Sequence, residues 1–403
     1  MRTIVASFVG CLAILALVAA FPSTGHAAKD SIVIGTAISL SGPYAQGAAM
    51  ITIPNYKMWV EEVNAKGGLY VKEYNKKLPI KLIMYDDKSD IGTMVKLVEQ
   101  LALKDKVDLI LPPWGTAMHF AVAPVATKYK YPVIGATISS ERLREMAHKV
   151  PYFFCILNMP REQGQALVDL CEEVGVKKVA LIYVADLYGV EWTGKVAPDL
   201  GLKKIDVAVL QSYPLDTKDL SPLLKTIQAA NVDALLGMSY PDDTFLITKQ
   251  AIELGYNPKL FYLGVGTAFP EYKGAFGGAE GVMGAGAWNP KLPFPGAKDY
   301  YERHLKKWGR APDGWGSPFV YSSLQVLQQS IENVGLDRTK IRDYIASHTF
   351  QTVIGPARFE GGFNVNSPGE IGQWQNGEYE IVAAKEKRTA KPIYPKPPWP
   401  EKK

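Results

Sequence analysis

The segment Ser31-Ile-Val-Ile-Gly-Thr-Ala-Ile-Ser-Leu-Ser-Gly-Pro-Tyr-Ala-Gln-Gly47 decides the fold that we predict for this chain. Its first part, Ile32–Ser39, is a short apolar run with β-branched residues, which is typical of a buried strand. Its second part, Leu40–Gly47, contains glycine, proline and hydroxyl-bearing side chains, which indicate a loop. The segment therefore predicts a buried strand that ends in a polar loop.

An apolar leader precedes this strand. Residues 1–27 contain one basic residue, Arg2, an apolar run over Ile4–Phe21 and small residues at positions 25–27. This is the pattern of a cleavable signal peptide, so we predict an exported, periplasmic protein. An uncleaved anchor is the alternative. Cys11 lies inside the apolar run rather than at its end, which argues against lipoprotein processing.

The composition after the leader indicates two domains and excludes some partners. About 375 residues remain, more than one typical hydrophobic core holds. The chain has 45 basic and 40 acidic residues, so loss of Arg2 leaves a net charge of about +4. This small, dispersed excess does not predict binding to nucleic acid. Cys155 and Cys171 are too few for a disulfide scaffold; two buried thiols are the simpler expectation, and one bridge is the alternative.

Short apolar strands alternate with amphipathic helical patterns along the rest of the chain. This alternation predicts an α/β fold with doubly wound, mostly parallel sheets, and its restart after residue 152 predicts two such lobes. The expected strands are Ile32–Ser39, Ile80–Tyr85, Asp108–Leu111, Pro132–Ala136, Phe153–Leu157, Val179–Val184, Val207–Gln211, Ala234–Met238, Leu260–Gly264 and Glu378–Ala383. The later helices are expected at Glu162–Val174, Ser221–Ala230, Thr244–Leu254, Tyr300–Trp308 and Val320–Val334.

Ligands of open α/β sheets bind beyond the carboxyl ends of the strands, which selects six loops. Thr116 and Ser139 lie in two of these loops, each near an expected helix start. Free amides at a helix N-terminus bind carboxylates, although both residues could also be ordinary N-caps. The six loops are Leu40–Gly47, Pro112–Ala117, Ala136–Ser140, Ala185–Gly189, Ser239–Asp243 and Val265–Phe269.

The sequence lacks the common signatures of catalysis. It has no G-x-S-x-G, G-x-x-x-x-G-K-[ST], H-E-x-x-H or C-x-x-C motif, and its histidines are scattered without ligand spacing. The pairs Asp86-Asp87 and Asp242-Asp243 fit turn and capping roles better than acid–base chemistry. We therefore expect neither an enzyme nor a cofactor or metal site.

Several motifs, spread over essentially the whole chain after the leader, carry a resemblance to a known family. They are Ile34–Gly47, Val63-Asn-Ala-Lys-Gly-Gly68, Tyr85-Asp-Asp-Lys-Ser-Asp90, Asp219–Leu224, Ala230–Leu235 and Pro318–Gly335. Together they resemble the branched-chain amino acid (leucine/isoleucine/valine) binding family, which are substrate-binding proteins of ABC transporters with the type I periplasmic binding fold.

The resemblance implies two lobes joined by three crossovers, with a small-molecule ligand held between them and passed to an inner-membrane ABC permease. On this basis the first lobe takes residues 29–154 and 285–362, and the second takes residues 155–284 and 363–403. We expect a monomer. A ligand sensor that serves a separate membrane receptor and a periplasmic hydrolase are the alternatives.

The resemblance also assigns candidate ligand contacts. In relatives, the loops matching Gly115-Thr116 and Ala136–Ser139, which includes Thr137, hold the ligand carboxylate, and a tyrosine matching Tyr188 faces the ligand. We expect Tyr44, Trp114, Tyr240 and Phe269 to complete an aromatic cleft with Tyr188.

One departure concerns the ligand ammonium group. Relatives that bind amino acids place an acidic residue where this chain has Gly266. A buried ammonium without a partner costs several kcal/mol. Either Asp242 or Asp243 replaces the missing acid, or the ligand has no ammonium group. We favour a small carboxylate or amide with an apolar or aromatic body.

Overall fold

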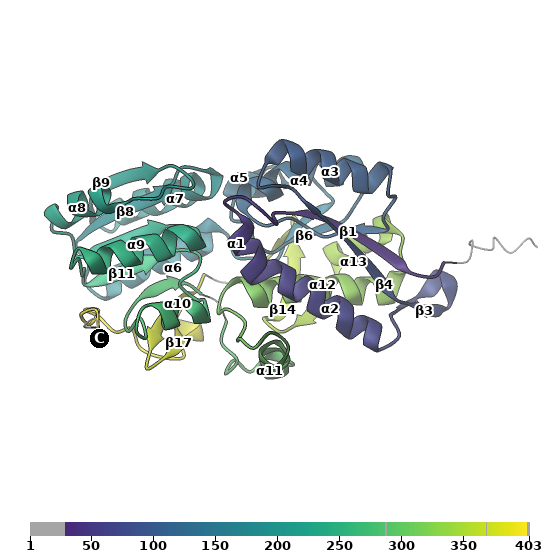
Figure 1. The fold of residues 1–403 in the computed structure, drawn as a ribbon. Coiled ribbons are helices and arrows are strands. Elements are labelled where there is room, and N and C mark those ends of the chain that lie inside the picture. The colour runs from purple at the N-terminus through teal and green to yellow at the C-terminus, as the bar shows by residue number, and fades with distance from the viewer. Residues whose placement is uncertain (1–28, 287, 368, 401–403) are drawn as a thin grey trace, which may run out of the picture.

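A computed structural model describes residues 29–286, 288–367 and 369–400. They form two α/β lobes that lie side by side (Figure 1). The predicted leader, residues 1–27, lies outside the described residues. Within the described part of the chain, no helix has both the length and the apolar character that a membrane span requires.

The lobe on the left of Figure 1 contains a seven-stranded sheet with the order β17-β16-β12-β11-β10-β8-β9. Pairs from β9 to β12 are parallel, whereas β16 and β17 join antiparallel at one edge. The strands are β8 (Lys178–Val184), β9 (Asp206–Tyr213), β10 (Ala234–Met238), β11 (Leu260–Leu263), β12 (Met283–Ala285), β16 (Ile371–Gln375) and β17 (Glu378–Ala383). The helices are α6 (Pro160–Glu173), α7 (Leu187–Leu202), α8 (Ser221–Ala229), α9 (Pro241–Glu253) and α10 (Pro270–Ala275).

The other lobe contains a parallel sheet, β4-β1-β5, and a mixed sheet, β13-β14-β15-β7-β6. Its strands are β1 (Ile32–Ile38), β4 (Ile80–Asp86), β5 (Leu109–Ile110), β6 (Val133–Gly135), β7 (Phe153–Cys155), β13 (Thr349–Thr352), β14 (Gly355–Glu360) and β15 (Phe363–Asn364), with the hairpin β2 (Leu69–Val71) and β3 (Lys76–Leu78). Its helices are α1 (Ala45–Gly47), α2 (Ile53–Ala65), α3 (Ile91–Leu103), α4 (Thr116–Lys128), α5 (Glu141–Glu145), α11 (Ala297–Trp308), α12 (Gly316–Val334) and α13 (Arg338–Ser347).

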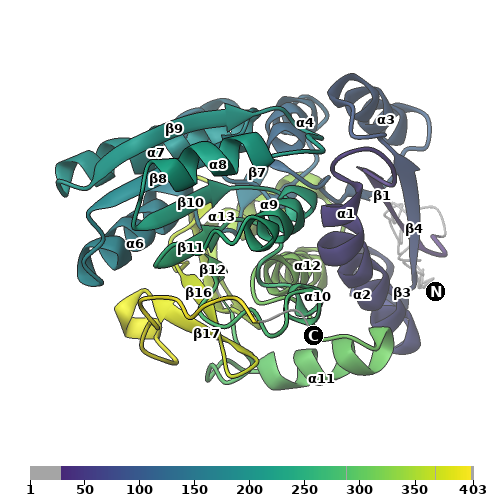
Figure 2. The ribbon, with the colours of Figure 1, turned by 60° about the vertical axis from the view of Figure 1, so that its left-hand side comes forward.

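Burial explains why the strands are apolar runs rather than alternating patterns. Every residue of β10 is buried, because helices cover both faces of a parallel sheet. The edge strand β9 instead alternates between half-buried and exposed positions over most of its length. The turned view in Figure 2 shows α8 and α9 on one side of this sheet and α6 on the other.

The chain passes between the sheets of the two lobes three times, after β7, after β12 and after β15. Glu370 connects these crossovers. Its carboxylate accepts a hydrogen bond from Asn158 Nδ2 at 2.9 Å, and its backbone carbonyl accepts one from the amide of Gly286 at 3.5 Å. An ion pair between the buried Glu370 carboxylate and the half-buried Lys387, at 2.7 Å, joins the C-terminal segment to the same point.

The predicted α/β fold of two parallel-sheet lobes is confirmed, and each predicted strand and helix is present with its ends shifted by a few residues. The sequence patterns did not predict the helices α7, α10 and α13 or the strands β2, β3, β12 and β13 to β16. Cys155 and Cys171 are both buried and free, which confirms the simpler expectation of two thiols.

Candidate ligand-binding cleft

The strand order directs particular loops of both lobes toward one place. In β4-β1-β5 and in β9-β8-β10, the strand order reverses beside β1 and beside β8. The loops that follow the strands on either side of such a switch point diverge and leave a crevice. The loops after β1 and β5 carry Tyr44 and Trp114, and those after β8 and β10 carry Asp186 and Tyr240.

Four aromatic side chains from these loops and the start of α7 pack together at the junction of the lobes. The ring of Tyr240 lies 5.1 Å from the ring of Trp114 and 5.5 Å from that of Tyr44, so it contacts both aromatic residues of the opposite lobe. Tyr188 stacks on Tyr240 at 5.1 Å. All four side chains are buried. The structure thus brings together four of the five predicted aromatic residues.

The indole N–H of Trp114 is a buried donor in this cluster. It has no hydrogen-bond partner among the described residues. A buried donor left unpaired costs about 1–3 kcal/mol. An acceptor that reached it would remove this cost.

Asp186 provides a carboxylate that both lobes share, and sequence reasoning did not identify it. Its Oδ2 accepts hydrogen bonds from the hydroxyls of Tyr240 at 2.6 Å and Tyr44 at 3.3 Å. Its Oδ1 accepts one from the amide of Gly189 at 3.1 Å and thereby caps α7. Burial raises the pKa of Asp186 above its ordinary value, although these donors oppose the effect. The only sequence signal was an Asp three residues before a glycine at a helix start, which indicates a cap.

Thr116 and Ser139, the predicted carboxylate contacts, lie next to each other. The amide of Ser139 donates to Thr116 Oγ1 at 3.2 Å, and Trp192 Nε1 of the other lobe donates to Ser139 Oγ at 3.0 Å. Neither residue is an N-cap: Gly115 occupies that position in α4, and Ser140 occupies it in α5. The N-cap interpretation of both residues is therefore wrong. Ala136 and Thr137 are buried in the same loop.

The loop after β11 has no room for a side chain at Gly266. Its φ is +107°, and a Cβ there would lie 2.9 Å from Cα of Pro241. Phe269 is buried and donates its amide to the carbonyl of Gly266 at 3.1 Å. Within the described residues, no ring contact joins Phe269 to the other four aromatic residues.

The two acids considered as substitutes for the missing one lie elsewhere. Asp242 is exposed on the first turn of α9. Asp243 is buried, but its carboxylate caps α9 by accepting from the amide of Tyr240 at 3.3 Å, and the hydroxyl of Tyr213 lies at 3.5 Å. Burial raises the pKa of Asp243 to about 7. Asp186, rather than either of these, is the acid that accepts from the hydroxyls of Tyr44 and Tyr240.

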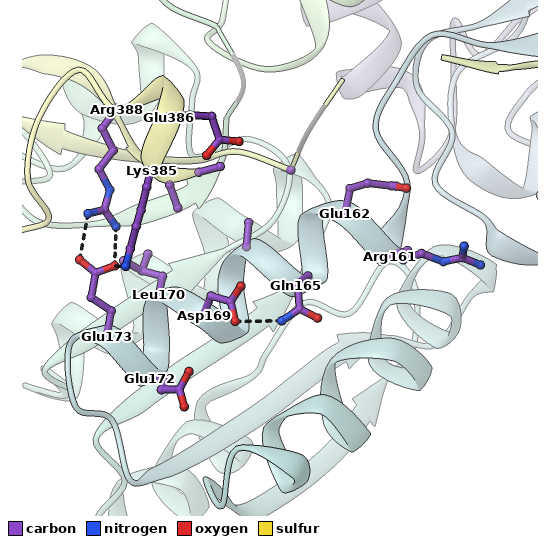
Figure 3. Close-up of a pocket in the computed structure, with 14 residues that line it drawn as sticks. Arg161, Glu162, Gln165, Asp169, Leu170, Glu172, Glu173, Lys385, Glu386 and Arg388 are labelled. Carbon is purple, nitrogen blue, oxygen red and sulfur yellow. Dashed lines mark hydrogen bonds and ion pairs between the residues drawn. The ribbon is translucent and has the colours of Figure 1, made fainter. Parts of the chain in front are cut away.

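A cavity of about 680 Å³ lies between α6 and the C-terminal segment, away from the aromatic cluster (Figure 3). Two of its basic groups pair with one acid. The Arg388 guanidinium pairs with both oxygens of Glu173, at 2.9 and 2.7 Å, and Lys385 approaches the same carboxylate. Among the described residues, no group of three or more His, Cys, Asp or Glu side chains could hold a metal ion.

The chain belongs to the periplasmic binding protein family, because the model of that family matches residues 31–378. It is similar to Leu/Ile/Val-binding protein homolog 7 of Brucella melitensis, with 24% identity over 397 residues that cover 91% of this chain and 94% of the relative. The resemblance to leucine/isoleucine/valine binding proteins is thereby confirmed.

Solved structures share the fold. A leucine binding protein of Thermotoga maritima matches with a TM-score of 0.75 and 20% identity, over 87% of this chain and 98% of that one. A solute binding protein of R. palustris in complex with benzoate matches with a TM-score of 0.76 and 16% identity, over 90% and 99%.

Proposed function

We propose that this protein is exported, captures a small carboxylate or amide between its lobes and delivers it to an inner-membrane ABC permease. Its family supports a role in binding solutes. We infer that it acts as a monomer without catalytic activity, with a first lobe of residues 29–154 and 285–362 and a second of residues 155–284 and 363–403. Hinge closure around a ligand is an established motion of this architecture.

The aromatic cluster is the observation that carries this proposal. Rings from both lobes meet there, and the buried indole N–H of Trp114 offers a donor to an acceptor atom. Carboxylate and amide oxygens are such acceptors, and flat or apolar ligand bodies pack well against aromatic rings. Thr116 and Ser139 supply further hydrogen-bonding groups close to each other.

The ligand that we favour has no ammonium group. Gly266 cannot carry the acid that pairs with an ammonium in relatives, and the Asp186 carboxylate already accepts three hydrogen bonds. Two solved structures of similar fold hold acids without an ammonium, namely benzoate and 3,4-dihydroxy benzoic acid.

An amino acid is the second candidate, and Asp186 is the observation that favours it. A carboxylate has more acceptor sites than its three donors occupy, so an ammonium group could still pair with Asp186. Structures of similar fold include a branched-chain amino acid binding protein of Streptococcus pneumoniae in complex with isoleucine.

Mass spectrometry of small molecules released from the purified, denatured protein tests the proposal directly. A thermal-shift screen with leucine, 4-methylpentanoate, benzoate and benzamide then compares the ligand classes. A true ligand at 100 times its Kd stabilises the protein by about 2.7 kcal/mol.

A matched pair of variants tests the site. Trp114→Phe removes the indole N–H of the cluster and keeps a ring. Trp308→Phe makes the same change on α11, where the indole N–H also has no partner among the described residues. We expect Trp114→Phe alone to weaken the binding of the identified ligand, by about 1.5–3 kcal/mol for a carboxylate. Equal effects of both variants would argue against the site.

A further inference from the structure

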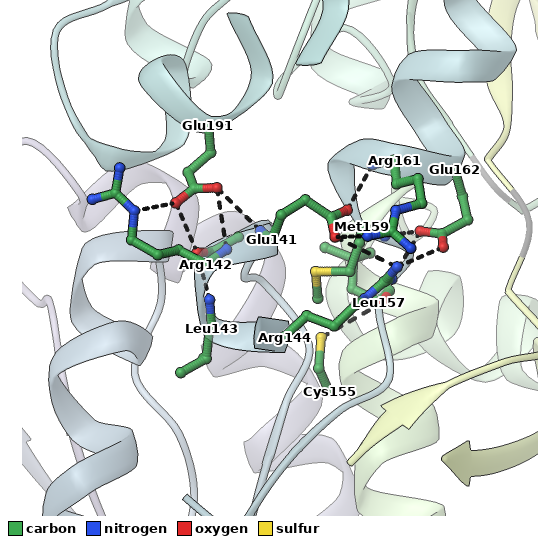
Figure 4. Close-up of polar contacts among 11 residues, drawn as sticks. Glu141, Arg142, Leu143, Arg144, Cys155, Leu157, Met159, Arg161, Glu162 and Glu191 are labelled. Atoms are coloured by element: carbon green, nitrogen blue, oxygen red, sulfur yellow. Dashed lines mark hydrogen bonds and ion pairs between the residues drawn. The ribbon is translucent and has the colours of Figure 1, made fainter. Parts of the chain in front are cut away.

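Glu191 makes a buried polar contact between the lobes that the ligand-binding residues do not account for. It lies on α7, and its side chain is only 8% exposed. Figure 4 shows its carboxylate at the start of α5 in the other lobe. It accepts hydrogen bonds from the Ser140 hydroxyl and the Glu141 amide, each at 3.1 Å, and from the Arg142 amide at 3.4 Å.

Two of these donors, the Glu141 and Arg142 amides, are groups that a short helix leaves unpaired. The first amides of a helix have no partner within it. In α5, Ser140 Oγ accepts from the amide of Leu143 at 3.2 Å, and the two preceding amides donate to Glu191. The start of α5 is therefore fully capped only while α7 is in contact with it. Hydrogen bonds to an ionised acceptor are also the stronger kind.

The same contact fixes a candidate ligand loop. Trp192, the next residue of α7, donates its indole N–H to Ser139 Oγ, and the Ser139 amide in turn donates to Thr116. Two consecutive residues of α7 therefore hold residues 139–142. This stretch ends the Ala136–Ser140 loop and begins α5.

The contacts that α5 makes with the start of α6 differ from the Glu191 contact in position, because they lie beside a crossover between the lobes. Arg144 pairs with both oxygens of Glu162 at 2.8 and 2.9 Å, and the amide of Arg161 donates to Glu141 at 2.8 Å (Figure 4). Residues 161 and 162 follow directly on the first crossover, where hinge motion is smallest. Glu191, by contrast, lies at the end of α7 that faces the cleft.

We propose that Glu191 is a closure latch and a positioning residue: it forms its hydrogen bonds only when the lobes close, and it then holds the Ala136–Ser140 loop in place for the ligand. The role of that loop rests on the proposed function, whereas the latch contact itself does not. Loss of the latch lowers the closed population and shortens the time that a ligand stays bound. A change that acts only on the closed state alters the dissociation rate more than the association rate.

Glu191→Gln tests the latch because it keeps the shape of the side chain and removes the charge. Glu172→Gln is the matched control: it makes the same change on α6 of the same lobe, where the side chain is 52% exposed and pairs with Lys203. Hydrogen exchange by mass spectrometry follows the amides of residues 141–143 in the full chain, first without ligand and then with leucine or benzoate.

We expect Glu191→Gln to speed exchange at these amides about 4- to 12-fold, since the hydrogen bonds keep an acceptor oxygen but become about half as strong without its charge. Glu172→Gln should leave exchange unchanged. Spin labels at Leu103→Cys on α3 and Leu202→Cys on α7, both exposed, should show fewer closed molecules in Glu191→Gln. Dissociation of a bound probe should quicken by a similar factor.

Equal exchange in wild type and Glu191→Gln, with and without probes, would overturn the latch, as would an equal effect of Glu172→Gln. If neither leucine nor benzoate binds, the proposed ligand classes lose support. The exchange and distance measurements on the protein alone would still decide whether the latch exists.

Discussion

The substitution Asp186→Asn distinguishes the two candidate ligand classes, acids without an ammonium group and amino acids. It replaces one carboxylate oxygen by an amide nitrogen and so removes the negative charge. Asn keeps the oxygen that caps α7, and it is as good an N-cap as Asp. The hydrogen bonds from Tyr240 and Tyr44 lose their ionic partner and become about half as strong. The variant also has no buried negative charge. In the wild type, burial of that charge is unfavourable and raises the pKa of Asp186. These effects oppose each other, so we expect the free energy of unfolding to change by less than about 1 kcal/mol.

The effect on binding depends on the ligand. A ligand whose ammonium group pairs with Asp186 would lose about 1.5–3 kcal/mol of binding free energy in the variant, which weakens its binding about 10- to 150-fold. A carboxylate without an ammonium loses nothing when a nearby negative charge is removed, so its binding should stay equal or become tighter. Because we favour the amine-free ligand, we expect benzoate or 4-methylpentanoate to bind Asp186→Asn at least as tightly as wild type.

Titration calorimetry with leucine, 4-methylpentanoate and benzoate measures this directly. Asp242→Asn is the control, since it makes the same change at an exposed position and should alter no Kd by more than about two-fold. Submicromolar binding of leucine that drops ten-fold or more in Asp186→Asn alone would refute the amine-free ligand. A similar loss for benzoate would refute the argument that the ligand makes no use of this charge.

Three further predictions concern the site and the hinge. Thr116→Ala should weaken a carboxylate probe by about 1.5–3 kcal/mol in calorimetry, whereas Thr127→Ala on the same helix should not; equal losses would contradict a direct contact. Gly264→Ala should lower the melting temperature and weaken binding, because its Cβ would lie 2.4 Å from the Tyr188 hydroxyl; an unchanged protein would show that Tyr188 moves freely. Burial raises the pKa of Glu370 to about 7. The folded state thus holds this proton more tightly than the unfolded chain, and the stabilisation that is complete below about pH 4.5 is lost as the pH rises to about 7. Denaturant unfolding at several pH values measures this. The free energy of unfolding should decline less steeply with pH in this window for Glu370→Gln than for wild type, and identical slopes would contradict the raised pKa of Glu370.

The sequence predicted most of the fold because buried strands and amphipathic helices leave strong patterns. Parallel strands covered on both faces appear as apolar runs, and β1, β8 and β10 are examples. Helix α7 escaped prediction because it contains Pro198 and several glycines, which weaken a helical pattern. Its buried stripe of Trp192, Val196 and Leu200 at four-residue spacing was the signal that could have found it.

The candidate cleft was predictable only in part, because strand ends fix loops but not the partners of side chains. Tyr44, Trp114, Tyr188 and Tyr240 meet as the rule for strand ends predicts. The bond between Asp186 and the Tyr44 hydroxyl depends on how the lobes are placed relative to each other, and the Tyr240 hydroxyl, from the same lobe as Asp186, meets the same oxygen. Spacing along the chain contains no information of that kind. The sequence therefore does not distinguish an aspartate that only caps a helix from one whose second carboxylate oxygen also accepts hydrogen bonds from side chains of the candidate cleft.

The position of the negative charge links these observations to the choice of ligand. A single acidic substitution at Gly266 would not restore the charge, because Pro241 and the positive φ leave no space for a side chain there. The aromatic cluster instead has its carboxylate at the start of α7, five residues before Glu191. Helix α7 thus contributes both the acid of the aromatic cluster and the cross-lobe hydrogen bonds to α5. Any motion that separates α7 from the other lobe breaks the Tyr44 contact of Asp186 together with the contacts of Glu191. The Asp186 charge in the aromatic cluster and the contact between the lobes are for this reason coupled through one helix.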